Sequence, residues 1–181
     1  MRSARPRRRL VGVALAVLLA VAVAVGTGYS DFRSRTPGDG TVTSGVVGEP
    51  VRVGERTFTV TSFEAATRFP AAEADEEPVT AMPGAVLVLV VLRTDHGPLD
   101  PTTSYCDVEL VDLRDDTVVR TWRDTDPFRY SVAAPEGYSC LGESPTERVT
   151  EMAAGFQVPA DAVPHLALRV GQEGAWAQIR R

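Results

Sequence analysis

The feature that most constrains this chain is an uncharged apolar run near its start. Leu10 to Gly26 contains only Leu, Val, Ala and Gly, and continuing to Tyr29 gives twenty residues without a charge. As a helix, twenty residues span roughly 30 Å, the hydrocarbon thickness of a bilayer. A helix inside a soluble domain carries polar residues at helical spacing, and this run has none. The sequence therefore predicts a membrane-directed helix over residues 10–29.

The residues before this run fix the expected orientation. Residues 1–9 contain five arginines, so the positive-inside rule keeps this head in the cytoplasm and sends the remainder across the membrane. Two outcomes remain open. An uncleaved signal anchor gives a single-pass membrane protein with its C-terminal domain outside the cytoplasm, whereas a cleaved signal peptide gives a secreted protein. The small-x-small sequence Ala20-Val21-Ala22 lies inside the apolar run, which favours the anchor.

The charge of the remainder excludes one class of partner. Beyond residue 9 the chain has 14 arginines and 24 acidic residues, a formal charge of −10, and the whole chain has no lysine. Nucleic-acid binding needs a basic face, so no nucleic-acid partner is expected. The use of Arg in place of Lys, together with abundant Ala, Val and Gly, is typical of a high-GC genome such as that of an actinobacterium.

The remaining chain divides into a linker and a β-rich domain. Residues 30–45 are rich in Ser, Thr, Gly and Pro, a composition typical of a flexible linker. Residues 46–181 contain seven or eight short segments with alternating or β-branched patterns, separated by turn residues. No long amphipathic helix interrupts them. This pattern predicts an all-β domain, an antiparallel two-sheet sandwich.

Several elements of this domain can be placed individually. Residues 85–94 (AVLVLVVLRT) predict a central strand buried on both faces, whereas residues 69–84 read as an irregular insertion. Residues 106–113 and 117–122 predict one hairpin. Residues 166–170 and 175–179 predict a second, closed by the four residues Gly171 to Gly174.

Two cysteines lie beyond the apolar run. Cys106 and Cys140 would meet an oxidising compartment after export, so we expect a disulfide between them. Free buried thiols and a redox pair are the alternatives. The long irregular segment from Asp124 to Pro145 contains Cys140 together with Phe128, Tyr130 and Tyr138, and a disulfide would pin it. We regard these three aromatic residues as a candidate recognition loop.

Catalytic, cofactor and metal sites are not expected. The two histidines, His96 and His165, fall in predicted surface loops, and neither lies near a Gly-x-Ser-x-Gly elbow, because the chain contains none. No glycine-rich phosphate loop is present. Zinc would need two more ligands besides the two cysteines, and His96 and His165 are the only histidines. We therefore predict a protein without enzymatic activity.

The layout resembles a known family. The anchor and tether, then Val46 to Gly54 (VVGEPVRVG) and Phe58 to Ser62 (FTVTS), are similar to the start of an immunoglobulin-like extracellular family of unknown function. That family occurs in actinobacterial and Gram-positive lipoproteins and membrane proteins. The segments 84–93, 108–112 and 156–159 resemble it too. The chain departs from the family in lacking a lipobox cysteine and an Asn-rich turn after Leu92. The resemblance implies an immunoglobulin-like sandwich with no known enzymatic activity.

These observations give one expected function. We expect a membrane-tethered or secreted extracytoplasmic module that binds an envelope protein or peptide without a small-molecule cofactor. A purely structural or chaperone-like envelope role is the alternative, followed by a hydrolase with an unrecognised site.

Overall fold

The computed structural model describes residues 41–73, 75–103, 105–123, 132–134, 140–172 and 174–181. The residues from Gly40 onward form a compact unit. Residues 1–29, with the predicted head and membrane-directed helix, lie outside the described part of the chain. No helix within the described residues is long and apolar enough to span a membrane.

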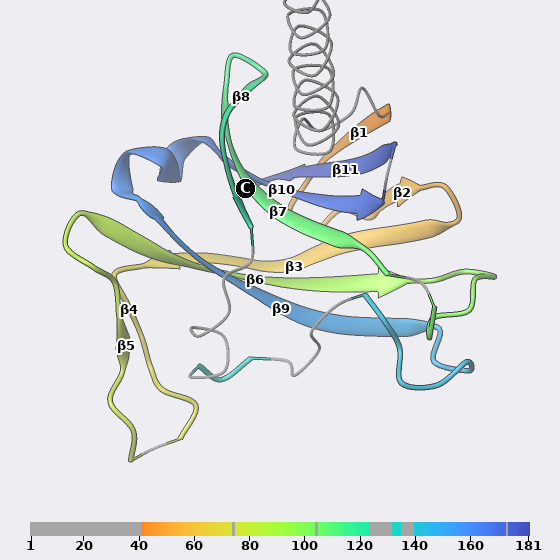
Figure 1. The fold of residues 1–181 in the computed structure, drawn as a ribbon, viewed down its shortest axis with the longest axis horizontal. Coiled ribbons are helices and arrows are strands. Elements are labelled where there is room, and N and C mark those ends of the chain that lie inside the picture. Colours follow the sequence, from red (N-terminus) through yellow and green to blue (C-terminus); the bar gives the residue numbers. More distant parts are fainter. Residues whose placement is uncertain (1–40, 74, 104, 124–131, 135–139, 173) are drawn as a thin grey trace, which may run out of the picture. The chain divides into compact units, whose positions relative to one another are not determined.

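Two β-sheets face each other across one core (Figure 1). The five-stranded sheet has the order β1–β11–β10–β7–β8 and contains Thr41–Val46 (β1), Ala175–Arg180 (β11), Leu166–Gln172 (β10), Asp107–Arg114 (β7) and Thr117–Arg123 (β8). The four-stranded sheet has the order β2–β3–β6–β9 and contains Val51–Val53 (β2), Arg56–Ala66 (β3), Ala85–Asp95 (β6) and Val149–Pro159 (β9). A 3-10 helix, Ala160–His165 (η2), connects β9 to β10 and so joins the two sheets.

Alternation along the strands builds the core between the sheets. Each strand turns every second side chain inward, and the inward set is apolar and buried on both sheets. The largest side chains that are fully buried there are Phe58, Phe156, Leu92, Leu110, Leu168 and Ile179. The predicted β-sandwich is thus confirmed as an architecture.

Strand β6 is buried on both faces, as its uninterrupted apolar sequence predicted. Val88, Val90 and Leu92 point into the main core, whereas Leu87 and Leu89 point to the outer face of the four-stranded sheet. The short strands Arg68–Phe69 (β4) and Val79–Thr80 (β5) pair there as a hairpin. Figure 1 shows this hairpin on the side of the four-stranded sheet that faces away from the five-stranded sheet. The segment predicted as an irregular insertion therefore contributes a cover for this outer face.

The N-terminal boundary differs from the sequence prediction. The segment 41–45, assigned to the linker, belongs to β1, which pairs in parallel with β11. The sandwich is consequently not purely antiparallel, and its two sheets contain nine strands rather than seven or eight. The direction of β1 follows from its connection, because the chain leaves it for the opposite sheet at β2 and forms no hairpin with its neighbour.

Both predicted hairpins are present. In β7–β8, Arg114 pairs with Thr117, and the two intervening aspartates have positive φ values of 50° and 62°, as a two-residue hairpin turn requires. In β10–β11 the pairing extends to Gln172 and Ala175, so the connection is two residues shorter than predicted. Gly171 lies inside the strand, where a Cβ atom would collide with the Ala175 carbonyl oxygen.

Candidate functional site

A disulfide joins the two sheets at one end of the sandwich. Cys106 directly precedes β7 in one sheet, and Cys140 lies in the segment that leads to β9 in the other. Their Cα atoms are 5.6 Å apart, and both residues are buried. The predicted bond is confirmed. We call this region the disulfide end; the β2–β3, β6–β7 and β10–β11 connections gather there, at the right of Figure 1.

A buried histidine lies next to the disulfide. His96 is completely buried, and its Nε2 atom is 3.0 Å from the Thr150 hydroxyl oxygen. That hydroxyl donates to the Cys140 carbonyl at 3.4 Å. Since the single hydroxyl proton goes to Cys140, Thr150 accepts from His96, and the neutral imidazole carries its proton on Nε2. Desolvation, followed by the charge of Arg56, holds the pKa of His96 below its ordinary value.

The placement of His96 corrects the sequence prediction of a surface loop. Val88, Val90, Leu92, Thr94 and His96 occupy alternate positions, and all five are buried. The alternation therefore continues past the apolar part of β6, and the inward position passes from apolar to polar side chains. His165, by contrast, is exposed at the end of η2, as expected for a loop residue.

A buried arginine holds the backbone next to Cys106. Arg56, at the start of β3, is buried and donates from Nη1 to the Tyr105 carbonyl at 2.8 Å. Gln172 donates from Nε2 to the same oxygen. Burial lowers the pKa of the Arg56 guanidinium. Two strands from opposite sheets thus fix one carbonyl group immediately before the disulfide.

The neighbouring loops are also tied together. Arg148 donates from Nη1 to the carbonyls of Gly97 and Leu99, at 3.1 Å each. The Gly142 amide donates to the Pro101 carbonyl at 3.0 Å. These contacts link the segment before β9 to the β6–β7 connection, so the disulfide end is a cross-linked set of loops.

Two exposed apolar side chains flank the disulfide. Tyr105 precedes Cys106 and is 54% exposed, and Leu141 follows Cys140 and is 40% exposed. Sequence reasoning missed both residues, as well as Arg56. For Tyr105 and Leu141, the available signal was their position next to the cysteines. Such neighbours lie on the surface wherever the disulfide lies at a domain end.

The proposed recognition loop is only partly described. Phe128, Tyr130 and Tyr138 lie outside the described residues. Within the same segment, Val132 is buried against the outer face of the four-stranded sheet and forms a bridge with Ala71. The middle of the segment therefore covers a sheet face at this point.

The opposite end of the sandwich carries a cluster of four charged residues. Asp112 is completely buried and accepts from Arg114 through two bonds of 3.2 Å, and Arg120 approaches it at 3.4 Å. Both arginines also reach Asp161 on η2, at 3.2 Å and 2.6 Å. The hydrogen bond from Arg120 holds the pKa of Asp161 below its usual value. This cluster fixes η2 against the β7–β8 hairpin.

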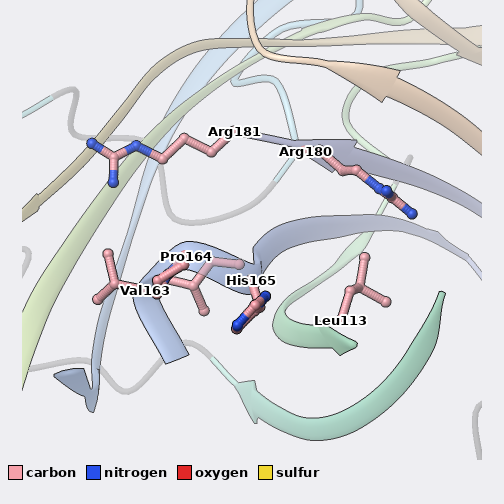
Figure 2. A pocket seen from close by; sticks show the side chains of 7 residues that line it. Leu113, Val163, Pro164, His165, Arg180 and Arg181 are labelled. Atoms are coloured by element: carbon pink, nitrogen blue, oxygen red, sulfur yellow. The ribbon is translucent and has the colours of Figure 1, made fainter. Parts of the chain in front are cut away.

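A pocket of about 500 Å³ lies beside this cluster (Figure 2). Its lining consists of Leu113, Val163, Pro164, His165, Leu166, Arg180 and Arg181. The lining contains no nucleophilic or carboxylate side chain. Across the described residues, no group of three or more His, Cys, Asp or Glu side chains converges as a metal site would require.

Comparison with known proteins adds information on the fold alone. No family model matches the chain, and no curated protein matches it. Among solved structures, a conserved hypothetical protein from Bacillus anthracis matches with a TM-score of 0.51 and 11% identity, over 75% of this chain and 94% of that one. An uncharacterized β-sandwich protein from Clostridium difficile gives a TM-score of 0.42 and 10% identity, over 77% and 94%.

Proposed function

We propose that this chain is an exported, immunoglobulin-like module of the cell envelope that binds a protein or peptide segment through its disulfide end. The partner places an apolar side chain against Tyr105 and Leu141, and no reaction is catalysed. The N-terminal helix holds the module at the cytoplasmic membrane, with the folded domain outside.

The presentation of Tyr105 is the observation that supports binding most strongly. Its carbonyl accepts from Arg56 and Gln172, and the next residue is held by the disulfide. Association costs entropy for every side chain and loop that must be ordered. An exposed tyrosine on a backbone that is already fixed loses little conformational entropy on binding. Tyr is also enriched among the residues that dominate binding energy.

Separate observations support the proposed location outside the cytoplasm and the proposed lack of catalysis. A disulfide between the two sheets is typical of proteins that fold outside the cytoplasm, which agrees with the arginine-headed apolar run. His96 is completely buried and bonded to Thr150, so its imidazole cannot reach a substrate. His165 faces a pocket whose lining offers no nucleophile for it to activate.

Site-specific photocrosslinking in the native envelope tests this function. A photoreactive phenylalanine analogue replaces Tyr105 in the full chain, and we expect a discrete crosslinked product with one protein. Val119 is a matched control, because it is 48% exposed and lies on strand β8, whereas Tyr105 lies in the β6–β7 connection. The Tyr105 product should disappear when Leu141 is changed to Asp. This change introduces a charge at the other residue that flanks the disulfide, and it does not open the core because Leu141 is exposed.

Two results would contradict the proposal. One is an identical product from positions 105 and 119, which indicates non-specific proximity. The other is a Tyr105 product that survives Leu141→Asp in a variant whose thermal unfolding matches that of the wild type.

A further inference from the structure

The ionisable side chains that line the pocket beside η2 are all basic. Its titratable lining residues are His165, Arg180 and Arg181, and its other lining residues are apolar or proline. This combination stands out because the chain beyond residue 9 has a formal charge of −10. Figure 2 shows Arg180 and Arg181 leaving the end of β11 in opposite directions, with His165 across the pocket from them.

Ion pairs hold the walls of the pocket. Asp161 on η2 is bonded to Arg114 and Arg120, which fixes the wall that carries Val163 to His165. Asp116, in the β7–β8 turn, pairs with Arg180 and ties the end of β11 to the same hairpin. Asp161 and Asp116 are therefore both engaged with arginines, and one of these arginines, Arg180, belongs to the lining.

Two cationic or hydrogen-bond-donating groups remain for a ligand. Neither His165 nor Arg181 has a salt-bridge partner in the part of the chain that the structure describes, and both are exposed. A guanidinium is permanently charged and suited to carboxylate or phosphate oxygens. An imidazole adds a directional N–H donor. Leu113, Val163 and Leu166 supply an apolar surface beside these groups.

We propose that this pocket binds a small organic anion, in which a carboxylate or phosphate group is attached to a short apolar body. The anionic group lies between His165 and Arg181, and the body packs on Leu113, Val163 and Leu166. A volume of about 500 Å³ falls within the usual range of small-molecule sites. This site is independent of the protein-binding surface at the disulfide end.

The histidine content of the chain gives a direct test. His96 and His165 are the only histidines, one buried at the disulfide end and one in the pocket, so ring labelling yields two NMR signals from the full chain in detergent micelles. His165→Gln assigns the signals. At constant neutral pH, titration with hexanoate or hexyl phosphate should move the His165 signal saturably, and His96 serves as the internal reference.

The ligand series separates the contributions of charge and apolar body. Acetate, hexanol and hexylamine should each bind more weakly than hexanoate, because each lacks the anion or the body. The relative response to hexanoate and hexyl phosphate decides between a carboxylate and a phosphate ligand. Arg181→Gln should weaken binding about two- to fivefold, the range of an exposed ion pair, and Arg181→Glu should weaken it further. Arg52→Gln, the same charge change at an exposed position of β2, should leave binding unchanged.

Several outcomes would overturn the proposal. These are a linear, non-saturating response of His165, equal movement of the His96 signal, equal binding of hexanol and hexanoate, or equal effects of Arg181→Gln and Arg52→Gln. Both variants alter exposed residues, so a folding defect does not obscure the comparison. A negative result here leaves the crosslinking prediction at Tyr105 unaffected.

Discussion

At the scale of single residues, the inward faces of the strands change from apolar to polar at both ends of the core. Thr94 and His96 continue the inward series of β6, and Arg56 precedes that of β3. At the other end Asp112 follows Leu110 on β7. Buried polar groups are costly unless they are bonded. His96 bonds to Thr150 and Asp112 bonds to its arginines. The Thr94 hydroxyl, Arg56 Nε and His96 Nδ1 are buried without a hydrogen-bond partner among the described residues.

The buried histidine predicts a pH dependence of stability. Burial and Arg56 lower the pKa of His96, assisted by Arg148 and opposed by Asp95 and Glu147. When the pH falls below the ordinary value of 6.5, the unfolded chain binds a proton that the folded protein does not, so the free energy of unfolding decreases. The stability is present above this value and is lost as the pH falls from it toward the folded-state pKa.

Urea unfolding from about pH 7.5 to about pH 5 measures this effect. His96→Gln should flatten the decline in unfolding free energy over this interval, because it removes the titrating group. Equal slopes for wild type and His96→Gln would show that carboxylates alone cause the decline.

At the scale of elements, the disulfide connects segments that no hairpin brings together. Cys106 and Cys140 are 34 residues apart in the sequence. The bond lies between opposite sheets, so it fixes the position of Cys140, which precedes β9 along the chain. Alternation within single strands could not indicate this, because the pairing depends on how the sheets stack.

Removal of the bond has a predictable cost. A loop of this length restricts the unfolded chain by about 3 to 4 kcal/mol in the chain-entropy model. The double variant Cys106→Ala/Cys140→Ala should lose about this much unfolding free energy in urea at neutral pH. Wild type measured under reducing conditions is the control and should match it. A loss of less than about 1 kcal/mol would mean that the unfolded chain is already restricted.

At the scale of the whole molecule, the two ends of the sandwich differ in character. The disulfide end presents apolar side chains on a fixed backbone, and the opposite end presents a basic pocket framed by ion pairs. The proposals for these ends concern different ligand classes and different residues. Together, the two proposals predict that the module binds an envelope protein and a small anion at once.

The proposed export predicts the topology of the full chain. A C-terminal alkaline phosphatase fusion should be active, because that enzyme needs the oxidising side of the membrane for its own disulfides. The same fusion without residues 10–29 should be inactive, since the apolar run carries the domain across. Activity that is independent of residues 10–29 would contradict the predicted role of this segment.

The sequence alone determined the strands whose side chains alternate or are uniformly apolar. The pattern of β6 predicted its burial on two faces, and the turn residues of β7–β8 predicted its hairpin. Strand β1 was not predicted, because it lies at a sheet edge with almost every side chain exposed. Its sequence therefore shows no alternation of buried apolar and exposed polar residues. The compartment implied by the apolar run, together with the two cysteines, was sufficient to predict the disulfide.

Tertiary structure decided where the ends of the strands meet. The burial of His96 and Arg56, the exposure of Tyr105 and Leu141, and the pocket around His165 all depend on the stacking and register of two sheets. The physical reason is that a strand's sequence records which of its faces is buried, whereas the neighbours of its last residues belong to distant segments. Those neighbours are fixed only when the two sheets pack on each other.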